Sequence, residues 1–292
     1  PLDREAAAAE RDVRHPRAAE RHAHPRAGAQ ALEQRPLALG ERLRDNGLAL
    51  YNVLSVGYAI EVLGGSPLYP ITAVELEAPQ LCDWLESLPW RERAWGAGAA
   101  VDAIGTALYF NARYFATGRA RETLFGWLAL RQDRGTGLWG APTAAEGLVQ
   151  PVNGFYRLTR GTYAQWGVPV PHAERAIDSV LTNYRDYAGF SGATYTACNL
   201  LDTIHPLWLC LRQTDHRRGE AEAVARAVIE RPGERWVDGE GFAFADGQAP
   251  SLQGTEMWLS TLYLAGAILG VEQDFAFVPK GVHRTQSVGL GL

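Results

Sequence analysis

The sequence contains few cysteines and almost no lysine. Its three cysteines, Cys82, Cys198 and Cys210, lie at spacings that match neither a paired disulfide framework nor a zinc-ligand motif. We therefore expect a reducing, cytoplasmic setting. Lys280 is the only lysine, so nearly all basic side chains are arginines, a bias that is typical of GC-rich bacterial genomes.

The sequence also lacks an excess of positive charge and a long apolar run. The formal net charge of −5 argues against nucleic-acid binding, because a phosphate-binding surface normally requires a basic excess. The most apolar segment, Leu252–Leu269, is interrupted by Gln253, Glu256 and Ser260, which excludes a membrane span. The N-terminal residues show no apolar core of a secretory signal. We expect neither nucleic acid nor a membrane among the partners.

The first 36 residues differ from the rest of the chain. Pro1–Pro36 is rich in Ala, Arg, Glu and His without hydrophobic periodicity, so we expect a poorly ordered tail. Its histidines, His15, His22 and His24, have no acidic or cysteine partner at ligand spacing. Residues 37–292 are predicted to form a single domain, since 47% hydrophobic content suffices for a core. Glycine-rich phosphate loops and nucleotide fingerprints are absent, which argues against kinase and dehydrogenase roles. Nothing in the sequence suggests a metal or an organic cofactor, so we expect neither.

Beyond the tail, two kinds of helical segment alternate. Segments that are apolar nearly all round must be buried on every side, and segments with one charged face can lie at the surface. The apolar segments are Leu48–Leu63, Gly98–Phe115, Val149–Gln165, Thr194–Leu211 and Leu252–Leu269. The amphipathic segments are about Ala73–Ser87, Arg119–Arg131, His172–Tyr187 and Asp215–Glu230.

This alternation predicts an all-α fold, an α/α toroid in which inner helices surround a central cavity and outer helices wrap them. An open helical solenoid is the main alternative. The ring would contain five helical hairpins, or six if Leu37–Asp45 forms a further short helix. An incomplete ring would favour a homo-oligomer. A brief β-hairpin is expected within Trp236–Phe244, with its turn at Asp238-Gly239 or Gly239-Glu240.

Each predicted inner helix carries polar residues in its N-terminal half. In a toroid with parallel inner helices these halves meet at one mouth of the cavity, which makes them the candidate site. The residues are Asn52, Ser55, Asp102, Thr106, Asn153, Tyr156, Asn199, Asp202, His205, Gln253, Thr255 and Glu256. For the three asparagines, capping or inter-helix hydrogen bonding is an equally good interpretation.

Two carboxylates lie inside apolar runs, where an unpaired charge is costly. Asp102 and Glu256 therefore need a partner or a catalytic task. Arg157 or Arg160, on the third predicted inner helix, could neutralise one of them in a structural ion pair. We favour a catalytic role for Asp102 and leave both interpretations open for Glu256.

The densest polar group is Asn199-Leu200-Leu201-Asp202-Thr203-Ile204-His205-Pro206. Its spacing places Asn199, Asp202 and His205 on one face of a helix. Pro206 has no N–H to donate, so we expect a kink there. His205, oriented by the carboxylate of Asp202, is a candidate general acid or base. A buried, hydrogen-bonded core histidine is an equally good interpretation.

Aromatic side chains are frequent on the same segments. Their ring faces attract both sugar C–H groups and positive charge, so they predict a binding cavity without selecting its ligand. These residues are Tyr51, Tyr58, Tyr109, Tyr114, Phe155, Tyr156, Tyr163, Trp208, Trp258 and Tyr263.

The loop Arg131–Gly140 contains an Asp, a Thr-Gly pair and a Leu-Trp pair that ends at Trp139. It lies between the segment of Asp102 and the tripeptide Asn153-Gly154-Phe155. In this order of motifs, residues 95–165 resemble the unsaturated glucuronyl and rhamnogalacturonyl hydrolases. The resemblance implies that Asp102 protonates the double bond of an unsaturated uronic acid so that water can add. The loop ends in glycine where that family has a histidine.

The same loop resembles the Gln-Trp repeat of terpenoid cyclases through Gln132, Gly137 and Trp139. The Asp-rich motif with which those cyclases protonate an alkene is missing. Other toroid enzymes isomerise or hydrate terpenols with Asp, Tyr, His and Cys in an aromatic cavity. Cys198, next to Asn199, keeps that alternative open.

We therefore predict a carbohydrate-active, hydrolase-like enzyme that acts on a small molecule or an oligosaccharide. Two carboxylates about 5 Å apart would indicate retention of configuration, and about 6.5–9.5 Å inversion. The candidate acid–base residues are Asp102, Asp202, His205 and Glu256. The candidate substrate-binding residues are Asn52, Tyr58, Tyr109, Trp139, Asn153, Tyr156, Asn199 and Trp258.

Two other classes of function remain open. A terpenoid cyclase, hydratase or isomerase would require a drier cavity with fewer polar groups. A non-catalytic helical scaffold predicts that side chains fill the cavity and that arginines neutralise the carboxylates.

Overall fold

The computed structural model describes residues 47–191, 194–231, 233 and 235–287. The predicted tail, Pro1–Pro36, and the candidate helix Leu37–Asp45 lie outside the described residues. Within those ranges the chain is mostly helical, and the only sheet has two short strands, which confirms the all-α prediction. No helix in the same ranges is long and apolar enough to cross a membrane.

The described chain alternates between the two predicted kinds of helix. The apolar segments form α4 (Gly47–Val62), α6 (Ala94–Phe115), α8 (Val149–Thr159), α10 (Ala197–Leu211) and α12 (Leu252–Leu269). The amphipathic segments form α5 (Ala78–Glu86), α7 (Arg121–Arg131), α9 (Ala173–Asp186) and α11 (Arg218–Ile229). The first amphipathic segment starts later than predicted, because Thr72–Val74 forms a separate 3-10 turn, η2, and Pro79 lies in the first turn of α5, where proline is tolerated.

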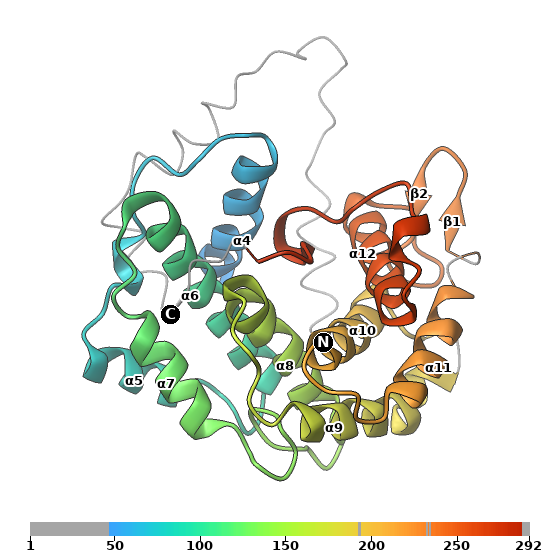
Figure 1. Cartoon of the computed structure of the whole chain (residues 1–292), viewed down its shortest axis with the longest axis horizontal. Coiled ribbons are helices and arrows are strands. Elements are labelled where there is room, and N and C mark those ends of the chain that lie inside the picture. Colours follow the sequence, from blue (N-terminus) through green and yellow to red (C-terminus); the bar gives the residue numbers. More distant parts are fainter. Residues whose placement is uncertain (1–46, 192–193, 232, 234, 288–292) are drawn as a thin grey trace.

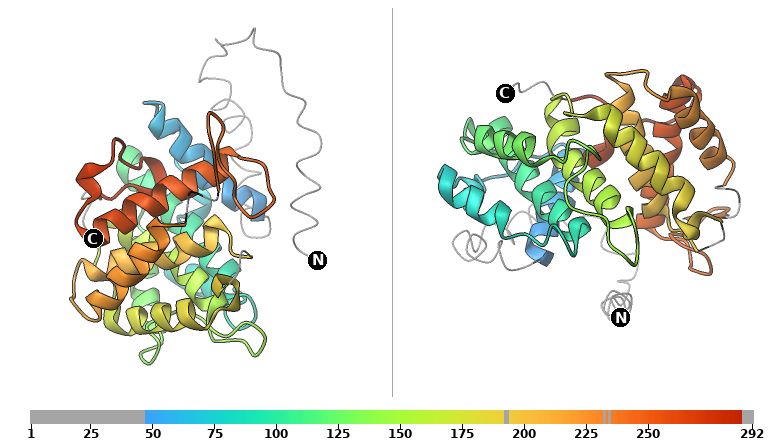
Figure 2. Two further views of the ribbon diagram at one scale, coloured as in Figure 1. Left: turned by 90° about the vertical axis from the view of Figure 1, so that its right-hand side faces the viewer. Right: turned by 90° about the horizontal axis from the view of Figure 1, so that it is seen from below.

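The helices pack in chain order. α4 packs on α6, α6 on α8, α8 on α10 and α10 on α12, so the apolar helices follow one another in an arc (Figure 1). The amphipathic helices pack outside them: α5 on α7, α9 on α8 and α10, and α11 on α10 and α12 (Figure 2). Burial agrees with this arrangement, since α6 is buried without interruption over residues 100–111.

Glycines bring α6 and α8 into backbone contact. A Cβ atom on Gly98 would clash with the backbone of Gly154, and one on Gly105 would clash with the backbone of Gly161. Both pairs have the same offset in sequence, so the two helices run parallel. Because no side chains separate the backbones, Asp102 of α6 can lie directly against residues at the end of α8.

The predicted helix Val149–Gln165 is not uniform. α8 ends at Thr159, and a π-helical turn, η3 (Arg160–Ala164), continues it. A π turn inserts an extra residue into the helical ladder and is frequent at functional sites. α10, in contrast, continues through Pro206 to Leu211, so the expected kink does not end the helix.

After α12 the chain returns across the open side of the arc. This C-terminal segment, residues 271–287, contains the 3-10 turns η6 (Glu272–Asp274) and η7 (Gly281–His283). η6 packs on α12, whereas η7 packs on α4 and η3. The segment therefore lies between the last and the first of the apolar helices (Figure 1).

The predicted β-hairpin is confirmed. β1 (Trp236–Val237) and β2 (Gly241–Phe242) pair antiparallel, and residues 238–240 form the turn. This hairpin directly precedes α12, and the main-chain oxygen of Phe242 accepts a hydrogen bond from the backbone N–H of Ser251, the N-cap of α12. It thereby fixes where the last apolar helix begins.

Candidate functional site

Asp102 and Arg160 form a buried ion pair between α6 and η3. Nε of Arg160 donates to Oδ2 of Asp102 at 3.0 Å, and Nη2 donates to the same oxygen. Burial raises the pKa of Asp102, and the charge of Arg160 opposes that shift. Burial also acts against the charge of Arg160, but Asp102 and Tyr156 outweigh it and raise the arginine pKa. The structural ion pair that the sequence offered as the alternative for Asp102 is present.

A second donor of Arg160 begins a chain of hydrogen bonds across the interior. Nη1 donates to the hydroxyl of Tyr156 at 2.8 Å, and this hydroxyl lies 2.6 Å from Nε2 of His283. Nδ1 of His283 lies 2.6 Å from Oε1 of Glu256, to which Ser260 Oγ also donates at 3.1 Å. We call the following five residues the relay: Asp102, Arg160, Tyr156, His283 and Glu256.

Neutral His283 with its proton on Nδ1 gives the relay one direction of proton donation. A guanidinium can only donate, so the Tyr156 hydroxyl accepts from Arg160, and with this tautomer the hydroxyl donates its own proton to Nε2 of His283. His283 then carries its ring proton on Nδ1 and donates it to Glu256. A carboxylate, an imidazole and a hydroxyl in this order form the arrangement that activates a hydroxyl by general base catalysis.

Glu256 is the end of the relay that reaches solvent, with 44% of its side chain exposed, whereas the side chain of His283 is 1% exposed. Burial raises the pKa of Glu256, but the charge of His283 and hydrogen bonds from His283 and Ser260 outweigh burial and bring the pKa to about 2. Glu256 is therefore a carboxylate at neutral pH, as the hydrogen-bond direction requires.

A second polar group lies between α8 and α10. Sγ of Cys198 lies 3.6 and 3.7 Å from the two carboxylate oxygens of the fully buried Asp202. The same sulfur accepts from Nη2 of Arg157 at 3.7 Å. Burial raises the pKa of Asp202 to about 7, against the opposing charges of Arg157 and Arg160. This carboxyl group can therefore hold or release a proton near neutral pH.

His205 is not oriented by Asp202, which corrects the sequence-based expectation. Its Nδ1 is buried without a hydrogen-bond partner in the described part of the chain. The ring packs instead against Tyr156 and Trp208, with ring centres 5.2 and 5.4 Å apart. Burial and the charges of His283 and Arg160 lower the pKa of His205 well below its ordinary value, so the ring is neutral. The carboxylate-oriented histidine expected at His205 is found at His283.

The cationic side chain of Arg284 packs on the rings of two buried tyrosines. Its guanidinium lies 4.9 Å from the ring centre of Tyr109 and 5.7 Å from that of Tyr58. Its Nη1 also donates to Glu61 of α4 at 3.2 Å. The hydroxyl of Tyr58 donates to Gln165, beyond η3. Two of the three predicted substrate-binding tyrosines, Tyr58 and Tyr109, therefore face a side chain of the C-terminal segment.

The two tryptophans predicted to bind substrate lie in the hydrophobic core. The indole N–H of Trp139 donates to the main-chain oxygen of Leu128 at 2.9 Å, and that of Trp258 donates to the main-chain oxygen of Ala243 at 3.0 Å. Both are almost fully buried, and the Trp139 ring is stacked on Tyr163. Neither belongs to the relay.

The three predicted asparagines have different environments. Asn199 forms a capping box with Thr196 at the start of α10, so its capping interpretation is confirmed. Asn153 is buried on α8, and its Nδ2 has no hydrogen-bond partner among the described residues. Asn52 is half-buried on α4 and takes part in none of the hydrogen bonds of the relay. Asn153 lies one helical turn before Arg157 on α8.

His283 and Arg284 were missed by the sequence analysis. Both follow Gly281 in a segment without helical periodicity, so no pattern connects them with the apolar helices. Two basic residues in such a segment would ordinarily be predicted to lie at the protein surface. Their placement depends on contacts with residues more than a hundred positions earlier, such as Tyr156 and Glu61.

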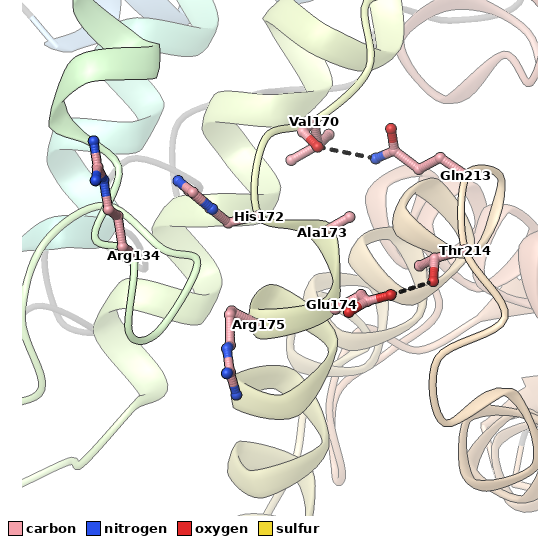
Figure 3. Close-up of a pocket in the computed structure, with 8 residues that line it drawn as sticks. All are labelled: Arg134, Val170, His172, Ala173, Glu174, Arg175, Gln213 and Thr214. Atoms are coloured by element: carbon pink, nitrogen blue, oxygen red, sulfur yellow. Dashed lines mark hydrogen bonds between the residues drawn. The ribbon is translucent and has the colours of Figure 1, made fainter.

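Two further observations concern ligands. In residues 47–191, 194–231 and 235–287, no group of three or more His, Cys, Asp and Glu side chains is placed to hold a metal ion. A separate surface pocket of about 520 Å³ lies near the start of α9 (Figure 3). Its lining residues are Arg134, Val170, His172, Ala173, Glu174, Arg175, Gln213 and Thr214. None of the relay residues takes part in it.

Comparisons with known proteins give no further assignment. A scan against protein-family models and searches of curated proteins and of solved structures find no match to this chain. The geometry of the interior polar groups is therefore the guide to a function.

Proposed function

We propose that the protein is an α/α-toroid enzyme that uses the relay for acid–base chemistry on a carbohydrate. The observation that carries the proposal is the unbroken chain of hydrogen bonds from Asp102 through Tyr156 and His283 to Glu256. A buried polar network of this extent is costly to desolvate, so its presence favours a catalytic task over simple packing.

The packing order supports the toroid. The five apolar helices contact one another in sequence, and the amphipathic helices pack outside them. The C-terminal segment supplies the missing contact of a ring, because η7 packs on α4 while His283 binds Glu256 of α12. In this interpretation the segment takes the position between the first and last inner helices.

In the proposed mechanism, Tyr156 and Asp202 are the two proton carriers. Glu256 orients His283 and stabilises its charged form, and Nε2 of His283 takes the proton of the Tyr156 hydroxyl. Burial raises the pKa of Tyr156, and the charges of Arg160 and Arg157 oppose that shift. The phenolate that forms is therefore stabilised by the guanidinium that already donates to its oxygen.

These groups can together hydrolyse a glycosidic bond. The Tyr156 phenolate takes a proton from water, and the water oxygen bonds to the anomeric carbon as the bond from that carbon to the leaving oxygen breaks. Asp202 gives its proton to the leaving oxygen. To restore the starting state, Asp202 takes a proton from solvent and His283 gives up to solvent the proton that it took from Tyr156, because Tyr156 has already regained its proton from water. Asp102 acts as a positioning residue, because it contacts Arg160 alone in the relay.

The aromatic side chains around the relay favour a sugar as the substrate. Tyr58 and Tyr109 lie beside polar groups, with Arg284 over their rings. Aromatic rings beside polar groups are the combination that stacks on sugar C–H surfaces and binds hydroxyl groups. A terpenoid substrate is less well supported, since the buried ion pair and hydrogen bonds make the interior polar.

The test is a hydrolysis assay on the full chain against neutral and acidic oligosaccharides, with prenyl alcohols and diphosphates included. Tyr156→Phe and His283→Gln are each expected to lower kcat by about 100-fold or more, the range for a lost general acid or base. Tyr163→Phe is the matched control, because Tyr163 is also buried but its hydroxyl has no partner in the described structure. Equal loss in Tyr163→Phe and Tyr156→Phe, or turnover of prenyl substrates only, would overturn the carbohydrate proposal.

A non-catalytic scaffold is the second candidate function. It is favoured by the neutralisation of Asp102 by Arg160 and by the position of Arg284 over the aromatic rings. For a scaffold, Tyr156→Phe and His283→Gln would change the free energy of unfolding while no substrate of the panel is turned over.

A further inference from the structure

Arg157 and Arg160 lie three residues apart but have different partners. Arg160 is paired with Asp102, whereas Nη2 of Arg157 contacts the thiol of Cys198 at 3.7 Å. A thiol is a weak acceptor, and it lies between Arg157 and Asp202, whose charge acts on the guanidinium without a direct hydrogen bond. Nε of Arg157 is buried and has no hydrogen-bond partner among the described residues. A buried guanidinium without a direct counter-ion is costly, so this cation lacks a partner that it needs.

Two buried groups near Arg157 are also unpaired. Asn153 precedes Arg157 by four residues on the same face of α8, and its Nδ2 has no partner in the described chain. His205 faces α8 from α10, with its ring 5.2 Å from that of Tyr156, and its Nδ1 is unpaired too. Each of these two side chains is only 2% exposed. Arg157 and His205 both pack on the ring of Tyr156, with the guanidinium carbon 5.6 Å and the imidazole centre 5.2 Å from the ring centre. Unsatisfied buried polar atoms are rare in folded proteins, so these three side chains call for a shared partner.

The charges around these groups are mixed. Arg157 and Arg160 face the group from α8 and η3, Asp202 and Cys198 face it from α10, and His283 faces it from the C-terminal segment. Asp102 also acts on Arg157 from α6, but it is itself paired with Arg160. Asp202 is the other carboxyl group near Arg157, and its raised pKa, about 7, allows it to be neutral. As a protonated acid it adds a further donor instead of a repelling charge.

We propose that Asn153, Arg157 and His205 form a binding site for a small oxyanion group, a carboxylate or a phosphate, between α8 and α10. The guanidinium supplies the positive charge and the amide and imidazole supply directed N–H donors, a donor set suited to the oxygens of an anion. Neither the ion pair of Asp102 nor the surface pocket near α9 shares these residues.

The site extends the proposed function in one respect. Because Tyr156 lies next to Arg157 in sequence and contacts His205, a bound anionic group would place the rest of its molecule beside the relay. To that extent the inference rests on the proposed function. Binding is measured without turnover, so the absence of hydrolysis would overturn the function and leave the site standing.

The experiment measures binding of acetate and of inorganic phosphate to the full chain by isothermal titration calorimetry, at constant ionic strength maintained with chloride. Arg157→Gln is expected to raise the dissociation constant of the anion by about 10- to 100-fold, the effect of losing a charged hydrogen bond. Arg212→Gln is the matched control, because Arg212 lies over the ring of Trp208 at the end of α10 and is exposed. It is expected to bind as the wild type does.

A second variant guards against loss of folding in Arg157→Gln. Asn153→Asp places a carboxylate one turn from Arg157, so it should neutralise the guanidinium, abolish anion binding and raise the unfolding temperature. Preference for acetate would identify a carboxylate as the source of the anionic group, and preference for phosphate would identify a phosphate. Absence of binding to wild type, or equal binding by wild type and Asn153→Asp, would overturn the proposal.

Discussion

The contact between α6 and η3 and the contact between α8 and α10 each bury an aspartate near an arginine. Asp102 is 1% exposed and Asp202 is 0% exposed, so burial does not distinguish them. Asp102 touches its arginine directly, whereas a thiol lies between Asp202 and Arg157. The spacing of the helices, and not burial, therefore determines which carboxylate forms a direct ion pair and which keeps a proton near neutral pH.

The largest expected effect is a loss of stability in Asp102→Asn. Removing one member of a buried ion pair leaves an uncompensated charge on Arg160, which costs about 3–5 kcal/mol of unfolding free energy. Asp202→Asn is the matched change on α10, and it should cost about 1 kcal/mol or less, since no direct ion pair is lost. Urea unfolding of both variants would measure the difference. Equal losses would remove the distinction between the two contacts.

The next effect tests the glycines that set the spacing of α6 and α8. A methyl group on Gly105 would clash with the backbone of Gly161, so Gly105→Ala should separate the helices and lose about 2–3 kcal/mol through overpacking. Gly126→Ala is the control, because a Cβ there meets no atom within 4 Å. In this helical position the control should gain about 0.5–1 kcal/mol. If Gly105→Ala leaves the free energy of unfolding unchanged, the spacing of α6 and α8 is not set by this glycine.

A smaller effect concerns pH and Asp202. Its folded-state pKa of about 7 exceeds the ordinary value of 3.8, so the folded protein binds the proton more tightly than the unfolded chain. The stability it contributes is present below the unfolded pKa and is lost as pH rises through the folded pKa. Between pH 5 and pH 7 we expect a loss of about 2 kcal/mol, since each unit of pKa difference is worth about 1.4 kcal/mol. The loss should be absent in Asp202→Asn, as measured by unfolding at each pH.

The smallest effect is expected for a substitution that makes the contact between α8 and α10 resemble the contact between α6 and η3. Cys198→Ser replaces a weak thiol with a hydroxyl, which is a stronger donor to a carboxylate. The pKa of Asp202 should fall, because a hydrogen bond to the charged form favours ionisation, and stability should change by about 1 kcal/mol. Nuclear magnetic resonance titration of the Asp202 carboxyl carbon would detect the shift. A rise in the pKa would contradict this account of the thiol.

The helices could be predicted from sequence because hydrophobic patterning carries most of their signal. α12 has the predicted bounds, Leu252–Leu269, since its apolar run is flanked by Ser251 and Gly270, ordinary residues at the two ends of a helix. The π turn after Thr159 could not be predicted, because apolar periodicity is the same for α and π turns over so few residues. The glycine contacts were equally hidden, as a glycine in a helix gives no sign of which backbone it meets.

The candidate site could be predicted only in part. Asp102, Tyr156 and Glu256 were selected from sequence because polar residues inside apolar helices are conspicuous. Their connection was not predictable, since it depends on His283, a residue outside any helix pattern. The histidine that patterning did select, His205, shares a helix with Asp202, yet the shared face brings its ring to Tyr156 instead of to the carboxylate.

The late position of His283 in the chain bears on how the protein is made. During synthesis α4, α6, α8, α10 and α12 all leave the ribosome before His283, which follows Tyr156 by 127 positions. Until then the hydroxyl of Tyr156 and the carboxylate of Glu256 must be solvated by water, because their common partner has not been translated. The nascent chain therefore passes through a stage in which the apolar helices have been made but the link between Tyr156 and Glu256 has not.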